Sequence, residues 1–331
     1  MGSLLDGSVT SGEFSHLYNQ SVRFTDELSD GLEKRASKRI ILYVESKEDY
    51  EIFRERWFSH LSEWITFHAV DDVNGGGGGS AVVYRRVKHD RERDICSYGI
   101  VDRDVLLNGY VTGRPVKWDA FFEPNHEIFK NAVSGILGSY IKVLRRWEIE
   151  NYLLHPVAVR EFLKDSKLNK SLGTKSSTER LLDFSEIAII LTATELALMK
   201  LGQSWGPLKM FYEINDAHTL MSKLMEKMRK DNLSVIENEI NENCQKIKRF
   251  LLDDADNPDE KWNQINHLIN GKIFLERFFV GLGLKDSPQY HLASKISDDL
   301  IDPELQEFMG GLKEEAERLF RGESCLSRCS P

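Results

Sequence analysis

The chain has 331 residues, of which 41% are hydrophobic and 10% aromatic, a composition typical of a globular protein with a buried core. Its formal net charge of -9 argues against passive, charge-driven coating of nucleic acid or of an anionic membrane, so nucleic-acid contact would require a local basic patch or metal ions. The longest apolar stretch, Ile187 to Met199, is interrupted by polar residues and falls short of the roughly 20 residues of a membrane span, so we expect a buried helix there.

The two ends of the chain and its cysteines indicate where the protein resides. Residues 1–36 begin with MGSLLDGSVTSGEF, which lacks both the basic and the apolar region of a secretory signal, and we expect a disordered or cloning-derived tail there and a second tail at 323–331. The four cysteines, Cys96, Cys244, Cys325 and Cys329, include no CxxC pair and no histidine cluster, so we expect neither a disulfide framework nor a zinc site. A reducing, cytoplasmic location fits this pattern.

The first half of the chain, residues 37–156, is predicted to be an α/β domain. Short apolar runs at 40–44, 64–70, 98–101 and 140–144 alternate with amphipathic stretches, which is the pattern of β/α units around a mostly parallel sheet. Helices are expected after the first strand, with Phe53 and Trp57 on the inner face, and at 80–93, with Val83 and Val87 facing inward.

The second half, residues 157–322, is predicted to be a largely α-helical domain. Helical patterns dominate at 157–163, 177–201, 208–230, 233–252, 262–280 and 303–320, with only short breaks between them. The predicted boundary lies near residue 156.

Acidic residues follow three of the predicted strands. Glu45 follows the first strand, Asp102 and Asp104 follow the third, and Glu148 and Glu150 follow the fourth. In open α/β sheets the ligand crevice lies beyond the carboxyl ends of the strands, so these acids can meet in one site. Mg²⁺ prefers hard oxygen ligands and is held by one or two carboxylates with waters and phosphate oxygens. An isolated Asp-x-Asp favours a solvated turn, but its combination with the other acids favours a metal site.

Two of these segments resemble a known family. The run IILYVESKEDYEIF is similar to the first Toprim motif, an apolar strand that delivers a glutamate, and GIVDRD is similar to the second, a strand that delivers Asp-x-Asp. Together with NGGGGGSAVV and WEIENYLL, residues 38–156 resemble the Toprim nucleases of phage-defence systems, namely the OLD-like nucleases and the AriB-type effectors of the PARIS system.

The resemblance implies a Toprim-type α/β core and a set of site residues. Glu45 matches the Toprim glutamate, which binds metal or serves as general acid or base, and Asp102 and Asp104 match the metal-binding aspartates. Glu150 is the predicted further acid, with Glu148 as the alternative ligand if the segment is extended. The implied cofactor is Mg²⁺, with Mn²⁺ able to substitute.

The resemblance also implies an activity and partners. The expected activity is nuclease cleavage of RNA, with tRNA favoured and DNA as the alternative, by an anti-phage effector. An ABC/OLD-like ATPase partner is expected to restrain the chain, and release could permit a homodimer; no membrane association is expected. A non-catalytic Toprim regulator or scaffold is the alternative from another functional class.

Several other residues permit two interpretations. Lys47 is predicted to contact a scissile phosphate or, equally, to be a solvated lysine at a helix start, whereas Asp49 is expected to be a first-turn helix acid outside the site. The glycines at 75–79 either cradle a phosphate or form a surface loop, and without a following Gly-Lys-Ser/Thr they predict no ATP hydrolysis. The histidines, including His68, His89 and His155, are expected to be structural. The basic stretch at 85–93 either tracks phosphates or is a solvated face. It comprises Arg85, Arg86, Lys88, Arg91 and Arg93.

Overall fold

A computed structural model describes residues 39–70, 79–109, 116–166, 175–203, 208–211, 213–233, 236–250, 257–282, 288–323 and 325. The predicted N-terminal tail, the glycines at 75–78 and most of the predicted C-terminal tail lie outside this range. The helices, strands and contacts given below belong to these residues.

Four parallel strands form the sheet of the first half. The order β2-β1-β3-β4 is built from β1 (Ile40–Val44), β2 (Ile65–Ala69), β3 (Ser97–Val101) and β4 (Ile141–Val143). Each neighbouring pair is parallel, with Leu42 opposite Tyr98 across β1 and β3. Every residue of β1 and β3 is buried, as the continuous apolar runs of a parallel sheet covered on both faces require. The four predicted strands and the α/β class are therefore confirmed.

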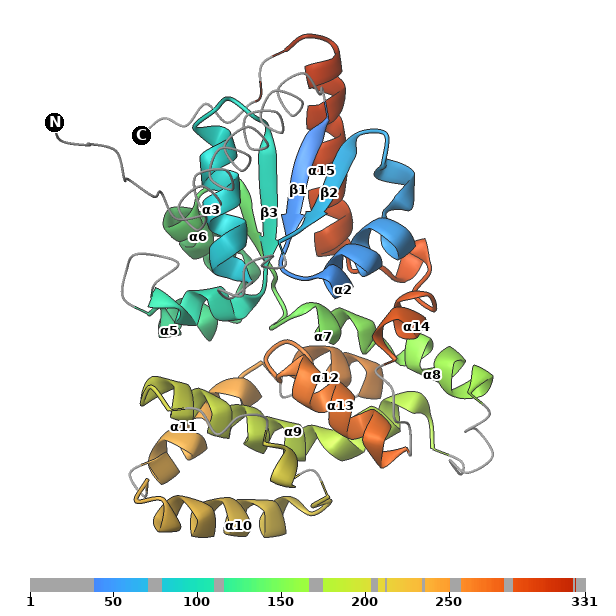
Figure 1. Ribbon diagram of the computed structural model, residues 1–331. Helices are drawn as coiled ribbons and strands as arrows, with labels where there is room; N and C mark the ends of the chain where they lie inside the picture. The colour runs from blue at the N-terminus through green and yellow to red at the C-terminus, as the bar shows by residue number, and fades with distance from the viewer. Residues whose placement is uncertain are drawn as a thin grey trace, which may run out of the picture.

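Helices cover both faces of this sheet (Figure 1). α3 (Ser80–Arg91) packs on β1 and β3 through the fully buried Val83 and Val87, as the sequence predicted. α15 (Pro303–Phe320) packs against β1 and β2. This last helix comes from the half of the chain predicted to be a separate helical domain, so the C-terminal segment returns to complete the α/β layer.

Most helices of the second half form a second layer below the carboxyl ends of the strands (Figure 1). α9 (Ser177–Lys200) is the centre of this layer and contacts most of the others, because Ile187 to Leu198 present buried side chains on nearly all sides. The helices around it are α8 (Pro156–Asp165), α10 (Ala217–Lys230), α11 (Ile236–Lys248), α12 (Pro258–Ile265) and α13 (Gly271–Gly281). α7 (Ile149–Leu153) lies between the sheet and this layer and contacts α13.

Some predicted helices differ from the structure. The helix expected after β1 starts as α2 (Lys47–Tyr50), continues as the π-helix η1 (Glu51–Trp57) and ends in the 3-10 turn η2 (Ser59–Leu61), although Phe53 and Trp57 are buried as predicted. The helix expected at 262–280 is two helices, because Asn270 caps a new helix by accepting a hydrogen bond from Ile273 N. The short helices α5 (Trp118–Phe121), α6 (His126–Leu137) and α14 (Gln289–Ala293) were not predicted.

The cysteines require a correction. Cys96 and Cys325 form a disulfide across 229 residues of sequence, whereas the scattered spacing predicted no such pair. Spacing along the chain carries no signal for this pair, because the fold of α15 onto the sheet creates the proximity. None of the described helices is both long enough and apolar enough to cross a bilayer.

Candidate metal site at the carboxyl end of the sheet

Glu45 and Asp102 lie at the point where the strand order changes direction. β1 and β3 are neighbours, and their crossovers leave to opposite sides, which makes the crevice beyond their carboxyl ends the preferred ligand position in such sheets. Glu45 follows β1 directly and Asp102 follows β3 directly. Asp102 N donates a hydrogen bond of 2.8 Å to Glu45 Oε1, so the structure joins these two predicted residues.

Asp104 is brought to the same place by a turn and not by an extended strand. After Asp102 the chain enters the 3-10 helix η3 (Arg103–Leu107), so the side chains of the Asp-x-Asp segment do not alternate as in a strand. Burial, followed by the charge of Asp104, raises the pKa of Glu45 to about 8. Burial, followed by Glu148, raises the pKa of Asp104 to about 6, and burial with Glu45 raises that of Asp102 well above its usual range.

Arg103, between the two aspartates, holds this turn in place. Its side chain is fully buried, and its guanidinium donates to main-chain carbonyls at Phe121 (2.8 Å) and Glu123 (2.9 Å) and to that of Arg145. It also lies 4.2 Å from the centre of the Phe129 ring. One buried cation thus ties the end of β3 to α5 and to the segment after β4 that carries Glu148 and Glu150.

Glu148 and Glu150 are both buried, at 4% and 3% exposure, so neither is a solvated surface acid. The segment is not extended, which was the condition for Glu148 as the alternative ligand: Glu148 is the N-cap of α7, and Glu150 lies in its first turn. Burial, then Glu148, raises the pKa of Glu150 to about 8. Glu150 Oε1 accepts from Gln289 Nε2 at 2.9 Å, while its Oε2 is buried without a hydrogen-bond partner.

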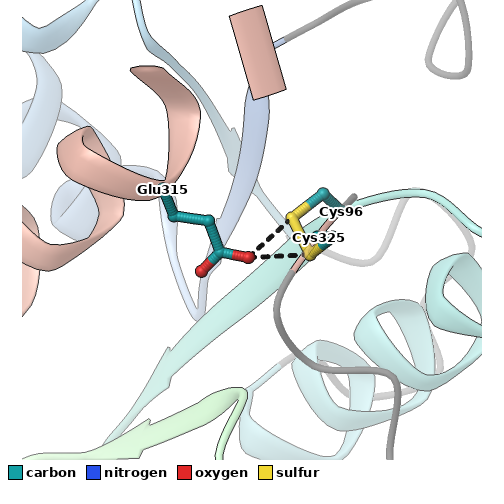
Figure 2. Close-up of side chains that lie close together, drawn as sticks. All are labelled: Cys96, Glu315 and Cys325. Carbon is teal, nitrogen blue, oxygen red and sulfur yellow. Dashed lines mark hydrogen bonds between the residues drawn. A yellow bond between two sulfur atoms is a disulfide. The ribbon is translucent and has the colours of Figure 1, made fainter. Parts of the chain in front are cut away.

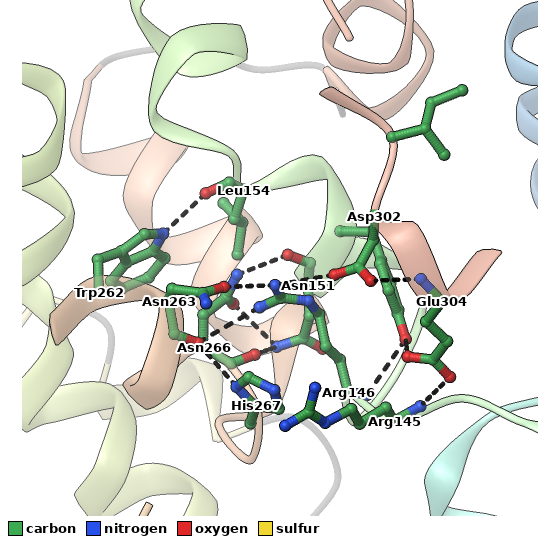
Figure 3. Close-up of polar contacts among 12 residues, drawn as sticks. Arg145, Arg146, Asn151, Leu154, Trp262, Asn263, Asn266, His267, Asp302 and Glu304 are labelled. Carbon is green, nitrogen blue, oxygen red and sulfur yellow. Dashed lines mark hydrogen bonds and ion pairs between the residues drawn. The ribbon is translucent and has the colours of Figure 1, made fainter. Parts of the chain in front are cut away.

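A polar network fixes the segment that carries these two glutamates (Figure 3). Glu304 at the start of α15 accepts from Arg145 N at 2.9 Å and from the Tyr152 hydroxyl at 3.0 Å. On the other side, Asn151 Nδ2 donates to Asn266 O at 3.0 Å. Gly271 is required here, because a Cβ at this position would lie 2.7 Å from Asn151 Oδ1. The α/β layer and the helical layer therefore both position Glu148 and Glu150.

Asp49 lies in the first turn of its helix as predicted but not outside the site, and Lys47 matches one of its two interpretations. Asp49 caps its own helix, because Ser46 N donates a hydrogen bond of 3.0 Å to Asp49 Oδ2. Its charge also raises the pKa values of Glu45 and Asp102, so Asp49 belongs to the group of acids at the carboxyl end of the sheet. Burial raises the pKa of Asp49 itself to about 6. Lys47 has a side chain that is 72% exposed and 3.7 Å from Glu51, which matches its alternative interpretation as a solvated lysine at a helix start.

Lys272 is the cation of the site and was not predicted. Its Nζ lies 3.1 Å from Glu148 Oε2 and 3.7 Å from Asp102 Oδ2, and its main-chain N donates to Glu148 Oε1 at 2.6 Å. Burial disfavours the charged form of Lys272, but the negative charges of Glu148, Glu150 and Asp102 outweigh this effect and raise the pKa of Lys272. Lys272 lies in the helical half, more than a hundred residues from the acids along the chain, so no sequence pattern indicated its place in the site.

The end of the glycine run reaches the site. Gly79 has a φ of 90° and precedes α3, and a Cβ there would lie 3.1 Å from Glu45 Oε2. The placement of this loop beside Glu45 is confirmed for Gly79, while its role in phosphate binding stays a prediction. In the basic stretch on α3, the side chains of Arg85, Arg86 and Lys88 are exposed. Arg91 instead donates a hydrogen bond of 2.8 Å from Nε to Ser97 O.

The acids form one electrostatic group without converging on one point. Among the described residues, the only three potential metal ligands whose atoms all lie within 4.8 Å of one another are Cys96, Glu315 and Cys325, at the opposite end of the sheet. The described carboxyl-end acids therefore do not bring three ligand atoms this close to one another. No family model, curated protein or solved structure matches the chain.

Proposed function

We propose that the chain is a Mg²⁺-dependent nuclease of the Toprim type whose site is the acid group at the carboxyl end of the sheet. The observation that carries this proposal is the pairing of Glu45 with Asp102 at the switch point between β1 and β3. Around this pair lie Asp49, Asp104, Glu148 and Glu150, and Lys272 is the cation beside them among the described residues. Carboxylates whose pKa values are raised together in a crevice are typical of functional sites.

The donor set fits a hard divalent cation. Every predicted ligand is a carboxylate, and the partnerless Oε2 of Glu150 is a buried acceptor that a cation or its bound water would satisfy. In this proposal Glu45, Asp102, Asp104 and Glu150 hold the ion or ions, with Glu148 kept in place by Lys272. Such ions activate water and stabilise charge on a phosphate.

The chain's own residues would orient the substrate. The side chain of Lys272 is 58% exposed beside the acids, so its ammonium is proposed to contact a phosphate oxygen of the substrate. The exposed Arg85, Arg86 and Lys88 on α3 extend from the Gly79 end of the site and offer the local basic surface that an acidic chain needs for nucleic acid. The buried hydrogen bonds of Arg103 preserve the spacing of the two aspartates.

The proposed substrate is RNA, with tRNA favoured, and this choice comes from the resemblance to AriB-type effectors. The test incubates the full chain with tRNA, single-stranded DNA, duplex DNA and plasmid in Mg²⁺, Mn²⁺ or EDTA. Metal-dependent cleavage of tRNA supports the proposal. Plasmid nicking with intact tRNA would favour the DNA endonuclease, and no cleavage of any polymer would favour the non-catalytic scaffold.

The proposed regulator is a separate ABC/OLD-like ATPase. The chain has no Walker A segment, and a free nuclease would damage its host, so the restraint must come from another protein. The helical layer is large enough to supply the roughly 800 Å² that each side of a specific interface needs. Co-expression with an ATPase encoded beside it, followed by purification, tests this: a complex with suppressed cleavage is expected, and independent elution with unchanged cleavage would contradict it.

A further inference from the structure

A second polar cluster lies at the amino end of the sheet (Figure 2). Cys96 directly precedes β3, and Cys325 follows the end of α15. Their sulfurs are bonded and their Cα atoms are 6.2 Å apart, within the usual range for a disulfide. Both residues are half-buried.

One carboxylate faces both sulfurs (Figure 2). Glu315 Oε1 lies 2.8 Å from Cys325 Sγ and 3.5 Å from Cys96 Sγ, while Oε2 accepts a hydrogen bond from the Tyr98 hydroxyl. Burial and the bond to Glu315 raise the pKa of Tyr98 to about 12, so Tyr98 stays a donor at physiological pH. Oε1 is placed to accept a proton or a hydrogen bond from either thiol in the reduced protein.

One cation touches only the C-terminal sulfur. Arg91 Nη1 lies 3.0 Å from Cys325 Sγ, and the guanidinium is held there by a bond of 2.8 Å from Nε to Ser97 O and by packing over the Tyr98 ring. A guanidinium beside a thiol favours the thiolate, which is the form that reacts with oxidants. The two cysteines therefore differ in their surroundings: Cys325 Sγ lies beside both the Arg91 guanidinium and Glu315, whereas Cys96 Sγ lies 3.5 Å from Glu315.

We propose that Cys96 and Cys325 form a redox-active oxidation site, with hydrogen peroxide as the oxidant. The Cys325 thiolate attacks a peroxide oxygen and breaks the O–O bond, giving a sulfenic acid and, after proton uptake, water. The Cys96 thiol then attacks the sulfenic sulfur, forms the S–S bond and releases the second water. Two thiols lose two electrons and two protons in total, and peroxide becomes two waters.

A metal site would be the other use of these ligand types. Two thiolates and a carboxylate suit zinc, but bonded sulfurs offer no thiolate, and the guanidinium at Cys325 repels a divalent ion. The surroundings favour redox chemistry over metal binding.

The disulfide fastens the C-terminal end of α15 to the sheet. The other end of α15 carries Glu304, which holds Arg145 and Tyr152 beside the segment of Glu148 and Glu150. Because the bond closes a loop across 229 residues, oxidation should raise the melting temperature, by about 5 °C or more.

The test oxidises the reduced full-length protein with hydrogen peroxide, blocks remaining thiols and maps tryptic peptides. Trypsin places the four cysteines in four different peptides. Cys96 lies in peptide 94–103, Cys325 in 322–328, Cys329 in 329–331 and Cys244 in 231–246. The expected product is a cross-link between 94–103 and 322–328 while Cys244 stays reduced. A Cys244→Ser protein is the matched control and should react like the wild type.

Substitutions of Arg91 and of Cys96 test the mechanism. Arg91→Gln should slow oxidation of Cys325 about tenfold at pH 7, and Arg91→Lys should restore most of the rate. Should Arg91→Gln fail to fold, Cys96→Ser decides the matter, because the sulfenic acid at Cys325 should then persist and react with a dimedone probe. Oxidation of Cys244 at the same rate, a cross-link through Cys329, or one zinc retained by the reduced protein and lost in Cys325→Ser would each overturn the proposal.

Discussion

The two ends of β3 place acids in opposite circumstances. At the carboxyl end, burial and neighbouring carboxylates raise the pKa values of Glu45, Asp102, Asp104 and Glu150, and the partly exposed Lys272 lies beside them. At the amino end, Glu315 has a hydrogen-bond donor on one oxygen and sulfur on the other. The first group gathers acids around one lysine, whereas in the second group one acid has a donor or a sulfur at each oxygen.

The largest expected effect is on catalysis at the carboxyl end. Asp102→Ala or Glu45→Ala should lower metal-dependent cleavage by at least about 100-fold, because each removes a ligand or an acid-base group. The fold should persist, since removing one carboxylate also relieves repulsion. Glu63→Ala, at an exposed position away from the acids, is the matched control and should keep full activity. A fully active Glu45→Ala enzyme would refute the site.

The next effect is on stability and concerns Arg103. Arg103→Leu should lower the free energy of unfolding by about 3 kcal/mol or more, because buried carbonyls of Phe121 and Glu123 lose a charged donor. Urea unfolding measures the change. An Arg56→Leu protein, altered at an exposed arginine, should lose much less; equal losses would show that Arg103 does not hold the turn.

A smaller, pH-dependent effect is expected at Glu150. Its pKa is about 8 when folded and near 4.5 when unfolded, so the folded state binds the proton more tightly and stability falls as pH rises from 4.5 to 8. Glu150→Gln removes this loss and should stabilise the metal-free protein by about 1–3 kcal/mol at pH 8.5, with the gain vanishing toward pH 4.5. Urea unfolding in EDTA at both pH values measures it. A gain independent of pH would contradict the assignment.

The smallest effect is expected at Lys272. Lys272→Met should destabilise the metal-free protein by about 1 kcal/mol or less, because the side chain is 58% exposed and solvent screens its ion pairs. The loss should shrink in Mg²⁺ if a bound cation replaces the ammonium charge. Lys261→Met, at an exposed lysine, is the control. A loss that grows in Mg²⁺ would argue against a cation site.

Local sequence predicted part of the carboxyl end, because Glu45 and Asp102 each directly follow an apolar strand. This pattern and the Toprim resemblance placed both residues in one site, and the structure joins them by a hydrogen bond. The helical start at Glu148 was not predicted, since the pattern after the fourth strand did not decide between an extended and a helical segment. Asp49 was underestimated, because a capping role does not exclude a place among the acids.

Contacts between distant segments could not be predicted. Lys272 reaches the acids only because Asn270 starts a new helix and Gly271 lets it approach Asn151. Cys325 meets Cys96 only because α15 returns to the sheet. Neither event leaves a periodic signal near the residues that it brings together.

Direct metal binding tests the central claim without knowledge of the substrate. Titration of the full-length protein with Mn²⁺, followed by electron paramagnetic resonance of the free ion at pH 8, counts bound ions. We expect one or two ions per chain, competed by Mg²⁺, with binding lost in Asp102→Asn and retained in Glu63→Gln. Absence of Mn²⁺ binding, or equal binding by Asp102→Asn, would contradict the assignment of this acid group as a metal site.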